Sequence, residues 1–540
     1  MSGGSTNHLE ILTLEDLTVF AKSQCLEENP STGVDAQVGS PGDNLAAAFL
    51  ESASLHGHQP ALTTSTGSWR YADLQDAALT LCERLKQSPS FALGSRVVLL
   101  LNNSPEYLAA FYGTLMAGGV VVPLSPRIEQ QQFRDIRQST AARHVVTQPR
   151  IARIWNSQFQ SINTEVDESE PGSSPADIPT SKELAAVFFT GGSSGTPKGV
   201  MLSHRNLIAN ARSIQNYLNI QSTDRPLCVL PFYHAFGNSV LQSHLLAGSQ
   251  LIIDGNTTFP ETLIDAISHH QATSLSGVPD LFRFLLERTS LGKRLLPSLR
   301  YLAVAGGSLP HDLALEVARK SEPSQFYVMY GQTEATARLA YIPPDHLQQL
   351  GSGCIGKAVP GMELEVVDPT GMPVPTGAVG EIRARGPGVM LGYWRDPELT
   401  REVIRDGWLH TGDLGSVDQQ GWIYHRGRRN ALIKIAGYRI HPSDIEDFVT
   451  RSLPIQQAVV VPYEAPGLGT RLALFARPRV DNDVKVLEIV ARCRADLPRH
   501  MVPDYVQLVE QFPLNEAMKI DRPRLISLAV EAATQRRKTA

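Results

Sequence analysis

The sequence predicts an α/β protein with a large N-terminal domain of layered sheets and helices that includes a β-rich subdomain, followed by a small α+β C-terminal domain. The length of 540 residues exceeds what a single core usually holds, so at least two domains are expected. Apolar, strand-like runs alternate with helix-length segments as far as about residue 331. Beyond about residue 365 the pattern changes to short strands separated by turn signals.

Residues 96–126 form the clearest structural unit. The apolar run Val97–Leu101 predicts a buried strand, and Val120–Val122 predicts the next one. Between them, the Ser104–Pro105 pair predicts a helix start through a capping hydroxyl and a fixed first-turn φ, and the Gly118–Gly119 pair predicts its end. A strand, a helix and a strand with short joints imply a parallel sheet with a right-handed crossover.

Further strands extend the predicted α/β region. They are expected at residues 185–190, 226–231, 249–254, 299–307 and 324–331. Residues 202–218 predict a helix, and the polar, Pro/Ser-rich residues 161–182 predict an exposed loop or linker. We expect residues 1–44 to be an N-terminal extension and a compact α+β tail to begin near residue 430.

The composition gives no reason to expect a nucleic-acid partner. Lys plus Arg total 49 and Asp plus Glu total 54, so the formal net charge is −5 and no basic surface for nucleic acid or an anionic membrane is expected. The cysteines are far apart, without a CxxC pair, which favours reduced thiols and argues against a structural zinc site. They are Cys25, Cys82, Cys228, Cys354 and Cys493.

No segment has the pattern of a secretory signal or a membrane span. The N-terminus lacks a basic start followed by an apolar run. The longest apolar region, from Arg96 to Pro123, is interrupted by polar residues such as Asn102 and Glu106. A cytoplasmic protein is therefore expected.

Residues 190–199, TGGSSGTPKG, predict a loop that binds a polyanion. The loop follows an apparent strand, and its backbone N–H groups, hydroxyls and one ammonium suit phosphate oxygens. The hydroxyls belong to Thr190, Ser193, Ser194 and Thr196, and the ammonium to Lys198. In the common P-loop the lysine follows a glycine and precedes Ser or Thr, whereas Lys198 lies between Pro197 and Gly199. The alternative is a surface turn without function.

Three later motifs carry side chains that could complete a nucleotide site. In YGQTEA (330–335), Tyr330 could stack on a base, Thr333 could bond a phosphate and Glu334 could ligate Mg²⁺. In WLHTGDLG (408–415), Asp413 could accept both ribose hydroxyls. The basic residues Arg428 and Lys434 begin the tail. Each motif taken alone is explained as well by a solvated glutamate, a turn-capping aspartate or solvated basic groups.

The motifs together, in their order, resemble the adenylate-forming superfamily of acyl-CoA synthetases, aryl-CoA ligases, amino-acid-adenylating domains and luciferases. The resemblance runs from about residue 45 to 525. It rests on TGGSSGTPKG, LPFYHAFG, VAGGSLP, YGQTEA, GEIRARGPGVMLGYW, GWLHTGDLG, GRRNALIKIAGYRIHPSDIE and PLNEAMKIDR. It implies an AMP-binding domain at 45–428, with the β-rich subdomain at 365–428, and a mobile C-terminal domain at 429–540 that rotates between two half-reactions.

The resemblance also implies the reaction. Members of this superfamily use MgATP to convert a carboxylate to an acyl-adenylate with release of pyrophosphate, after which a thiol attacks the adenylate. The cofactors implied are ATP and Mg²⁺, with CoA or a phosphopantetheine arm as the acceptor. The chemistry demands charge stabilisation and alignment at the α-phosphorus more than proton transfer.

The resemblance assigns expected roles to individual positions. The outer phosphates of ATP would be held by Thr190, Ser193, Ser194, Gly195, Thr196 and Lys198, and the adenine framed by Gly306, Gly307, Tyr330 and Gly331. Asp413 and Arg428 would bind the ribose, Thr333 the α-phosphate and Glu334 the Mg²⁺. Lys519 would bridge the carboxylate and the α-phosphate, so that Lys519, Thr333, Glu334 and His234 form the expected catalytic set. The acyl pocket would include His234, Phe236, Ala305, Gly307 and Gly331.

Two positions depart from the family pattern. Asn430 stands at the hinge, where Asp or Lys is usual, and Asn tolerates the backbone angles that a pivot needs. Met518 precedes the catalytic lysine, where Gly is usual. The pattern MKIDR still indicates Lys519 as the catalytic residue.

The acyl segment favours a fatty or aryl carboxylic acid. Amino-acid-adenylating relatives use an aspartate in this segment to pair with the substrate ammonium, but no acidic residue occurs between Cys228 and His244. A buried ammonium without a counter-charge would be costly, so an α-amino acid is disfavoured. His234 is either a gate to the reacting carboxylate or a structural histidine within the core.

Three alternatives remain open from the sequence. The chain could be an ATPase or kinase of the P-loop type, which the context of Lys198 opposes. It could be a non-catalytic protein that keeps a nucleotide site, which Lys519, Glu334 and Asp413 oppose. The acceptor could be CoA, a carrier-protein phosphopantetheine or an amine, with CoA favoured only by its frequency in the family. The expected partners are a small carboxylic acid and, in the alternative, an acyl or peptidyl carrier protein.

Overall fold

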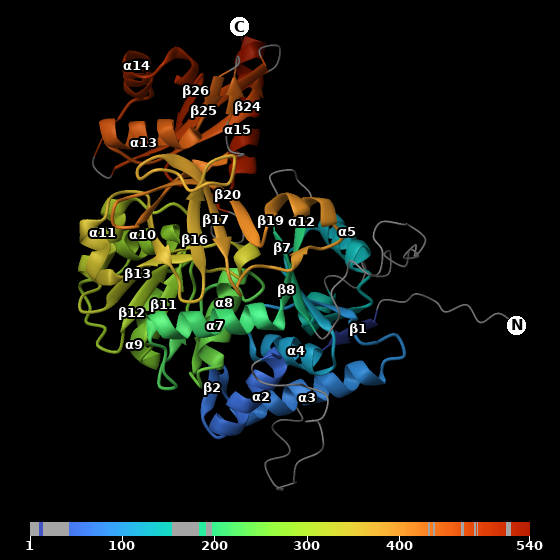
Figure 1. Cartoon of the computed structure of the whole chain (residues 1–540). Coiled ribbons are helices and arrows are strands. Elements are labelled where there is room, and N and C mark those ends of the chain that lie inside the picture. The colour runs from blue at the N-terminus through green and yellow to red at the C-terminus, as the bar shows by residue number, and fades with distance from the viewer. Residues whose placement is uncertain are drawn as a thin grey trace, which may run out of the picture. The chain divides into compact units, whose positions relative to one another are not determined.

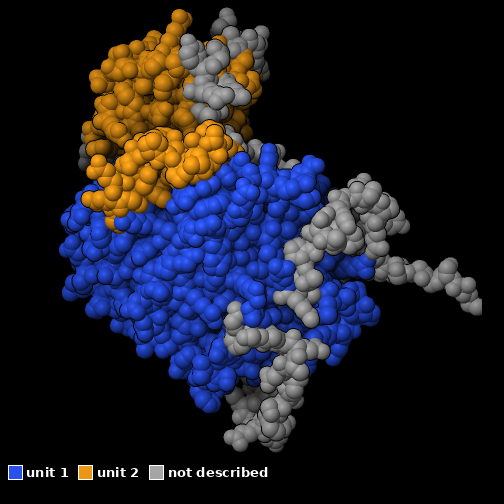
Figure 2. All heavy atoms as spheres, viewed as in Figure 1, with its two compact units in different colours: residues 1–365, 383–410 blue, residues 366–382, 411–540 orange. Residues whose placement is uncertain are grey.

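The computed structural model describes most of the chain, in two compact units. The described residues are 10–13, 43–153, 183–190, 197–429, 433–435, 438–465, 469–479, 482, 484–514 and 520–539. The first unit comprises residues 1–365 and 383–410, and the second comprises residues 366–382 and 411–540 (Figure 2). Within the described residues, no helix is long and apolar enough to cross a membrane.

The first unit contains a seven-stranded sheet in the order β1-β6-β4-β5-β7-β8-β18 (Figure 1). Its strands are β1 (Glu10–Thr13), β4 (Arg96–Leu100), β5 (Val120–Leu124), β6 (His144–Thr147), β7 (Leu184–Thr190), β8 (Lys198–Ser203) and β18 (Gly392–Tyr393). Neighbouring strands from β1 to β7 are parallel, whereas β8 is antiparallel to both β7 and β18. Strand β5 is buried along its whole length, as expected where both faces of a sheet are covered.

Nine short strands of a second sheet, among the described residues, also belong to this unit, in the order β15-β14-β13-β12-β11-β9-β10-β2-β3. They are β2 (Pro60–Thr64), β3 (Gly67–Arg70), β9 (Pro226–Leu227), β10 (Leu251–Ile253), β11 (Ser274–Gly277), β12 (Tyr301–Val304), β13 (Gln325–Tyr330), β14 (Ala340–Ile342) and β15 (Cys354–Ala358). The strands from β2 to β13 in this order run parallel. Their carboxyl ends therefore meet at one edge of the sheet, which is where open α/β sheets bind ligands.

Helices surround and separate the two sheets (Figure 1). They are α2 (Leu45–His56), α3 (Tyr71–Gln87), α4 (Pro105–Met116), α5 (Gln130–Thr140), α7 (His204–Leu218), α8 (Ala235–Leu245), α9 (Glu261–His270), α10 (Pro279–Arg288), α11 (His311–Lys320) and α12 (Pro397–Val403), with 3-10 turns η3 (Thr333–Ala335) and η4 (Pro344–Gln349). Ser104 caps α4 by accepting the amide of Tyr107 at 3.3 Å. Ile214 and Leu218 of α7 pack against Tyr327 on β13 in a buried cluster.

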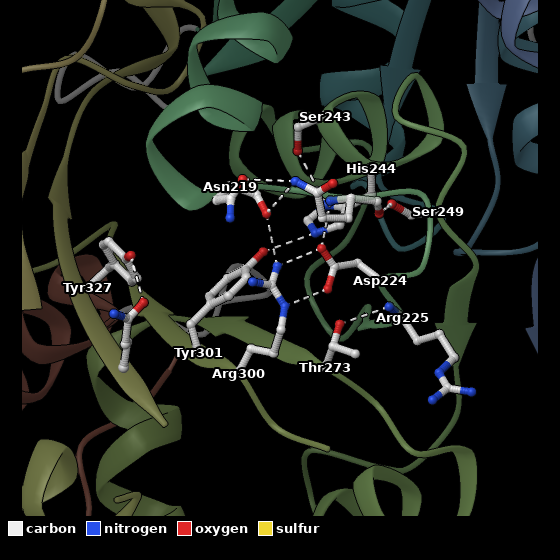
Figure 3. A network of polar contacts seen from close by, with 12 residues as sticks. Asn219, Asp224, Arg225, Ser243, His244, Ser249, Thr273, Arg300, Tyr301 and Tyr327 are labelled. Carbon is white, nitrogen blue, oxygen red and sulfur yellow. Dashed lines mark hydrogen bonds and ion pairs between the residues drawn. The ribbon is translucent and has the colours of Figure 1, made fainter. Parts of the chain in front are cut away.

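The amino ends of the parallel strands are joined by a polar network (Figure 3). Arg300, just before β12, donates from Nε and Nη2 to the two carboxylate oxygens of Asp224, at 2.8 and 2.6 Å. Burial opposes ionisation of Asp224, but the hydrogen bonds from Arg300 and the Gln221 amide outweigh it and lower the pKa of this carboxyl. Next to this pair, His244 bonds Tyr301 at 3.0 Å through Nε2.

The second unit carries the predicted C-terminal domain and part of the β-rich segment. Strands β16 (Glu363–Val367), β17 (Val379–Arg385) and β20 (Trp408–Val417) have residues in both units, and β21 (Ile423–Arg428) lies in the second. The four are hydrogen-bonded in that order, and β19 (Ile404–Arg405), a strand of the first unit, pairs with β20. The remaining elements are β22 (Ile433–Ile435), β23 (Tyr438–Ile440), β24 (Ile455–Ala465), β25 (Gly469–Pro478), β26 (Tyr505–Leu508), η6 (Arg499–Met501), α13 (Pro442–Ser452), α14 (Val486–Asp496) and α15 (Arg522–Thr539). Val460 of β24 lies in a core with residues of α13 and α14, whereas Val461 packs with residues of α15, so helices cover both faces of this sheet.

The predicted α/β fold with an α+β tail is confirmed, and the differences concern individual elements. The predicted strand Val97–Leu101 is β4 and the helix expected after Ser104 is α4. The helix expected at 202–218 begins at His204, because β8 precedes it and Ser203 is its N-cap. The strand expected at 226–231 is only two residues long. Residues 1–9, 14–42 and the expected linker at 161–182 lie outside the described part of the chain, and the domain boundary at 428/429 stays a prediction.

Candidate active site

The glycine-rich motif connects the two strands of a β-hairpin. Strands β7 and β8 pair antiparallel, with Thr190 opposite Lys198, and the Thr190 hydroxyl donates to the Lys198 carbonyl at 3.4 Å. The expected strand is β7 and the expected helix is α7, but strand β8, which was not predicted, lies between them. Four predicted phosphate ligands, Ser193, Ser194, Gly195 and Thr196, lie outside the described residues.

Tyr393 joins the lysine of this hairpin to the predicted magnesium ligand. Strand β18 pairs with β8, which brings the Tyr393 ring within 5.6 Å of the Lys198 ammonium in a cation–π contact. The Tyr393 hydroxyl donates to Oε1 of Glu334 at 2.8 Å. The Met390 amide donates to the Glu334 carbonyl at 2.9 Å, which ties the backbone of the same turn to this segment. Lys198 and Glu334, 136 positions apart by their residue numbers, are therefore held on either side of one tyrosine.

The turn after β13 carries four of the predicted site residues. Tyr330 ends β13, Gly331 follows, and Thr333 and Glu334 lie in the 3-10 turn η3. A Cβ at Gly331 would lie 2.0 Å from the carbonyl oxygen of Ala337, so only glycine allows the turn to fold back this closely. The predicted adenine, phosphate and metal ligands of this motif are thus placed by backbone packing at a strand end.

The predicted adenine wall lies at the carboxyl end of the neighbouring strand. Ala305 directly follows β12 and is buried, and its amide donates to the Gly277 carbonyl at 3.2 Å. Gly306 has φ +88°, a conformation that L-side chains rarely adopt. Gly307 comes next, near the Pro279 ring at the start of α10. The structure therefore brings Gly306–Gly307 and Tyr330–Gly331 to adjacent strand ends of the parallel sheet.

His234 and Phe236 are placed by the start of α8. His234 is the N-cap residue, its backbone amide donates to the Pro231 carbonyl at 3.1 Å, and its ring packs edge-on against Tyr233 at 4.7 Å. The next turn requires glycine, because a Cβ at Gly237 would lie 2.0 Å from the Pro231 carbonyl oxygen. Phe236 packs with Ala305 in one apolar cluster, so these two predicted pocket residues lie together.

A pocket also lies beside α8. Its lining comes from β7, β8, α7, α8 and the turn after η3 and consists of Phe188, Leu202, Leu207, Asn210, Ala235, Asn238, Ser239, Gln242 and Thr336. None of these side chains is charged. None of the residues predicted to line the acyl pocket is among them, so this pocket does not bear on the prediction that an α-amino acid is disfavoured.

In the second unit, Asp413 and Arg428 face each other across strands β20 and β21. The two residues are register partners, and Arg428 Nε donates to Asp413 Oδ1 at 2.9 Å. His425 Nε2 lies 3.5 Å from the same oxygen. The Asp413 side chain is 3% exposed and that of Arg428 65% exposed, so the carboxylate is held rigidly while the guanidinium remains open to solvent. Asn430, Met518 and Lys519 lie outside the described residues, as does the side chain of Lys434.

The residues around Glu334 are compatible with a magnesium ion if the phosphates of a nucleotide supply most of its ligands. Among the described residues, no group of three or more His, Cys, Asp or Glu side chains could hold a metal by itself. Mg²⁺ commonly uses one or two carboxylates together with substrate phosphates and water, and it prefers hard oxygen ligands. The Glu334 carboxylate beside the Thr333 hydroxyl supplies that kind of ligand.

Two residues of this region were missed by sequence reasoning. Tyr393 lies within the quoted motif GEIRARGPGVMLGYW, but the motif carries no signal that it pairs with β8. Arg338 follows YGQTEA by three positions and is 2% exposed, with its guanidinium 4.2 Å from the centre of the Phe236 ring. An arginine that follows a turn is expected to be exposed, so the burial of Arg338 can be seen only in the structure.

Comparisons with known proteins agree with this geometry. A long-chain-fatty-acid–CoA ligase of Escherichia coli is 28% identical, with 89% of this chain and 94% of the ligase aligned. A feruloyl-CoA synthase of an Amycolatopsis species is also 28% identical, over 87% of this chain and 95% of the synthase. The crystal structure of ATP-bound MatB from Rhodopseudomonas palustris superposes with a TM-score of 0.77 and 25% identity, covering 91% of this chain and 99% of MatB.

Two family models match the chain. The model of the AMP-binding enzyme C-terminal domain matches residues 444–519. The model of the AMP-binding enzyme matches residues 49–394, a span that includes the glycine-rich hairpin, the turn after β13 and Tyr393. The chain therefore belongs to the AMP-binding enzyme family.

Proposed function

We propose that this enzyme uses MgATP to convert a carboxylic acid to an acyl-adenylate with release of pyrophosphate, and then transfers the acyl group to the thiol of CoA. The observation that carries the proposal is the arrangement of Lys198, Tyr393 and Glu334, which places a cation and a carboxylate around one aromatic ring. The cation suits the outer phosphates and the carboxylate suits their metal ion. Membership of the AMP-binding enzyme family supports the same chemistry.

The residues of the first unit would act on the phosphates and the adenine. The outer phosphates would be bound by Thr190, Ser193, Ser194, Thr196 and Lys198, whose donors stabilise the charge of departing pyrophosphate. Thr333 would bond the α-phosphate, and Tyr330 would cover the adenine. Glu334 would hold Mg²⁺, and the ion would supply Lewis-acid charge stabilisation. Tyr393 would keep the Glu334 carboxylate oriented through its 2.8 Å hydrogen bond.

The residues of the second unit would act on the ribose and the reacting carboxylate. The Asp413 carboxylate, fixed by Arg428 at 2.9 Å, would accept the ribose hydroxyls. We propose Lys519 as the group that bridges the substrate carboxylate and the α-phosphate, because two anions that approach each other repel and an ammonium offsets that charge. Asn430 would serve as the pivot on which the C-terminal domain turns between adenylation and thiol attack.

CoA is the acceptor that the relatives favour over a carrier protein. The Escherichia coli and Amycolatopsis relatives are named as a CoA ligase and a CoA synthase, and both align over nearly their whole length. The substrate would be a fatty or aryl acid, since no acidic residue occurs between Cys228 and His244 to pair with the ammonium of an amino acid. A cytoplasmic location, the absence of a nucleic-acid partner and the magnesium requirement stay predictions.

The acceptor is tested by supplying both thiols in parallel. The enzyme is incubated with ATP, Mg²⁺ and a panel of fatty and aryl acids, with either CoA or a holo carrier protein, and thioesters are detected by mass spectrometry. We expect acyl-CoA to accumulate together with AMP. Acylation of the carrier protein alone would contradict CoA as the acceptor, and no thioester with either thiol would contradict the transfer step.

The role of Lys519 is tested by separating the half-reactions. In Lys519→Ala, acid-dependent pyrophosphate release should fall by about 10²-fold or more, because a charge-stabilising group is lost. Thioester formation from chemically prepared acyl-adenylate and CoA should change little. Lys485→Ala is the control, since Lys485 is an exposed lysine of the same unit. An equal loss in both half-reactions would show that Lys519 has another role.

A further inference from the structure

Arg338 is a buried arginine whose described partners are all neutral. It follows the 3-10 turn η3 and lies two positions before β14, and the residue is 2% exposed. Its guanidinium carbon lies 4.2 Å from the centre of the Phe236 ring, Nη1 donates to the Ala337 carbonyl at 3.4 Å, and a further hydrogen bond involves the Tyr217 side chain. Within the described residues, Nε has no hydrogen-bond partner and no carboxylate pairs with this side chain.

A guanidinium in this position needs an anion. Removing a charge from water without a counter-charge is costly, and buried charges in proteins are normally paired. Burial lowers the pKa of Arg338, yet an arginine stays protonated, so the cost is not avoided by losing a proton. Two less deeply buried arginines of the same unit do have a carboxylate partner: Arg300, 39% exposed, pairs with Asp224 at 2.6 Å, and Arg383, 16% exposed, pairs with Glu365 at 2.6 Å.

The position of Arg338 connects it to the predicted acyl pocket. Phe236, on which the guanidinium stacks, packs in the same apolar cluster as Ala305. On the other side, the chain before Arg338 folds back on Gly331, whose built Cβ would lie 2.9 Å from the Arg338 Cα atom. The Arg338 side chain therefore extends from the backbone beside Gly331, in the turn that carries Thr333 and Glu334, to Phe236 of the predicted pocket wall.

Aromatic side chains hold the guanidinium in place. Tyr217 stacks on Tyr341 with ring centres 4.4 Å apart, and its hydroxyl donates to the Met329 sulfur at 3.1 Å. Stacking on Phe236 covers one face of the guanidinium plane but leaves its edge, which carries the donors, without a carboxylate. The fork of N–H groups along that edge matches a carboxylate in two-point contact.

Resting on the proposed function, we propose that Arg338 binds a second carboxylate on the acyl substrate and that the preferred substrate is a dicarboxylic acid. One carboxylate of that acid would be adenylated beside Thr333, and the other would pair with the Arg338 guanidinium. Arg338 is then the residue that determines specificity for the remote end of the substrate. This narrows the predicted fatty or aryl acid to one that carries a second acidic group.

The test compares acids that differ only in the second carboxylate. The pairs are hexanoate with hexanedioate and 3-phenylpropanoate with 3-(4-carboxyphenyl)propanoate, and kcat/KM is measured for pyrophosphate release by the full-length enzyme. We expect the wild-type enzyme to favour the diacid of at least one pair by about 10²-fold or more, because a buried polar group left unpaired penalises the analogue that lacks its partner. A diacid should also raise the Tm in the presence of ATP more than its matched monoacid does.

Three variants separate binding of the second carboxylate from a structural role. Arg338→Met should lose about 10²-fold in kcat/KM for the preferred diacid, mainly through KM, and keep its rate on the monoacid within a few-fold. Arg338→Lys, which retains the charge, should recover part of the preference. Arg137→Met is the control: Arg137 is also buried, on α5, where it donates to the Ala142 carbonyl at 3.3 Å, and its loss should leave the ratio of diacid to monoacid unchanged.

The outcomes that overturn the inference are distinct from those that overturn the proposed function. A wild-type preference for the monoacid in both pairs would overturn the inference alone, and it does not depend on any variant folding. An equal loss on diacids and monoacids in Arg338→Met, with Tm preserved, would also overturn it, since Arg338 would then act on the reacting carboxylate. No pyrophosphate release with any acid would overturn the proposed function as well.

Discussion

The two ends of the parallel strands β11, β12 and β13 differ in how their charges are partnered. At the amino ends, Arg300 and Asp224 form an ion pair with two hydrogen bonds, and neutral groups around it complete the network (Figure 3). At the carboxyl ends, Arg338 and Glu334 have no ion-pair partner among the residues that the structure describes. At the amino ends the charged groups neutralise each other and link neighbouring strands. At the carboxyl ends the charged groups remain available to bind ligands.

Lys198 shows the same contrast from the neighbouring sheet. Its ammonium lies 5.6 Å from the Tyr393 ring centre and, in the described part of the chain, pairs with no carboxylate. Folding alone therefore does not explain why Lys198, Glu334 and Arg338 are held near strand ends. Substitutions at the two ends should accordingly change different properties: stability at the amino ends and catalysis or specificity at the carboxyl ends.

The largest expected effect is at Glu334. Glu334→Gln should lower kcat/KM for pyrophosphate release by about 10²- to 10³-fold, because a neutral amide is a weaker ligand than a carboxylate for the Mg²⁺ that Glu334 is proposed to hold. The free energy of unfolding should change little, since Glu334 has only the Tyr393 hydroxyl as a described side-chain partner. Kinetics and urea unfolding of the same preparations check both statements.

The matched control for Glu334→Gln is Glu363→Gln. Glu363 pairs with Arg385 at 2.6 Å in an exposed ion pair, which contributes little to stability and touches no predicted ligand. A comparable loss of activity in both variants would indicate a general electrostatic effect. That result would show that Glu334, which has no described ion-pair partner, matters no more for activity than Glu363, which is already paired.

The opposite pattern is expected at the amino ends. Asp224→Ala should lower the free energy of unfolding by about 2 kcal/mol, because the side chain is 2% exposed and its removal leaves Arg300 without its partner. The loss should be no larger because Arg300 is 39% exposed, so that water can replace the lost carboxylate. Urea denaturation followed by circular dichroism measures the loss. Folded Asp224→Ala protein should keep kcat within a few-fold of wild type, and a loss of catalysis without a loss of stability would contradict the comparison.

The pH dependence of stability should also reflect the amino ends of the strands, where His244 bonds Tyr301. Burial lowers the pKa of His244 to about 4, whereas the unfolded imidazole takes up its proton near pH 6.5. As pH falls from about 6.5 toward 4, the unfolded state binds the proton first, so stability decreases by up to about 1.4 kcal/mol per pH unit for this residue.

This pH effect can be assigned with one variant. Replacing His244 by Asn removes the titrating group, so the decrease in stability between pH 6.5 and 4 should become shallower than in the wild-type enzyme. His204, whose pKa burial also lowers to about 4, contributes in the same direction and remains in the variant. Urea midpoints at half-unit intervals of pH provide the measurement, and identical slopes would show that His244 is not buried in its neutral form.

The smallest expected effect concerns Tyr393. Tyr393→Phe keeps the ring over Lys198 and removes the hydroxyl that donates to Glu334 at 2.8 Å. We expect kcat/KM to fall by about 3- to 10-fold, the size of one neutral-donor hydrogen bond that orients a ligand. Tyr393→Leu should cost more, since the cation–π contact is lost too. Equal rates for the wild-type enzyme and Tyr393→Phe would show that Glu334 needs no such orientation.

Sequence reasoning predicts the fold class and the main motifs because these depend on local patterns. The run Val97–Leu101 and the cap at Ser104 identify β4 and α4 to within a residue or two. It fails at β8, where the short run after Lys198 is adjacent to a helix and either structure fits its pattern. The pairing of β8 with β18 links residues nearly two hundred positions apart, and no local signal predicts it.

The site shows the same division between local and long-range information. Thr333 and Glu334 are predicted because their motif places them at a strand end, and the structure has them in that turn. The roles of Tyr393 and Arg338 depend on which distant residues they meet, Lys198 in one case and Phe236 in the other. For Arg338 the decisive fact is burial without a carboxylate, which is a property of packing and has no sequence signature.

The most direct test of the proposed reaction is ATP–pyrophosphate exchange by the full-length enzyme with Mg²⁺, an acid from the panel and no CoA. If the carboxyl ends of the strands hold charges for adenylation, labelled pyrophosphate should enter ATP only when an acid is present, and AMP should be the nucleotide product once CoA is added. Formation of ADP and phosphate, or exchange that does not depend on an acid, would contradict the proposed reaction.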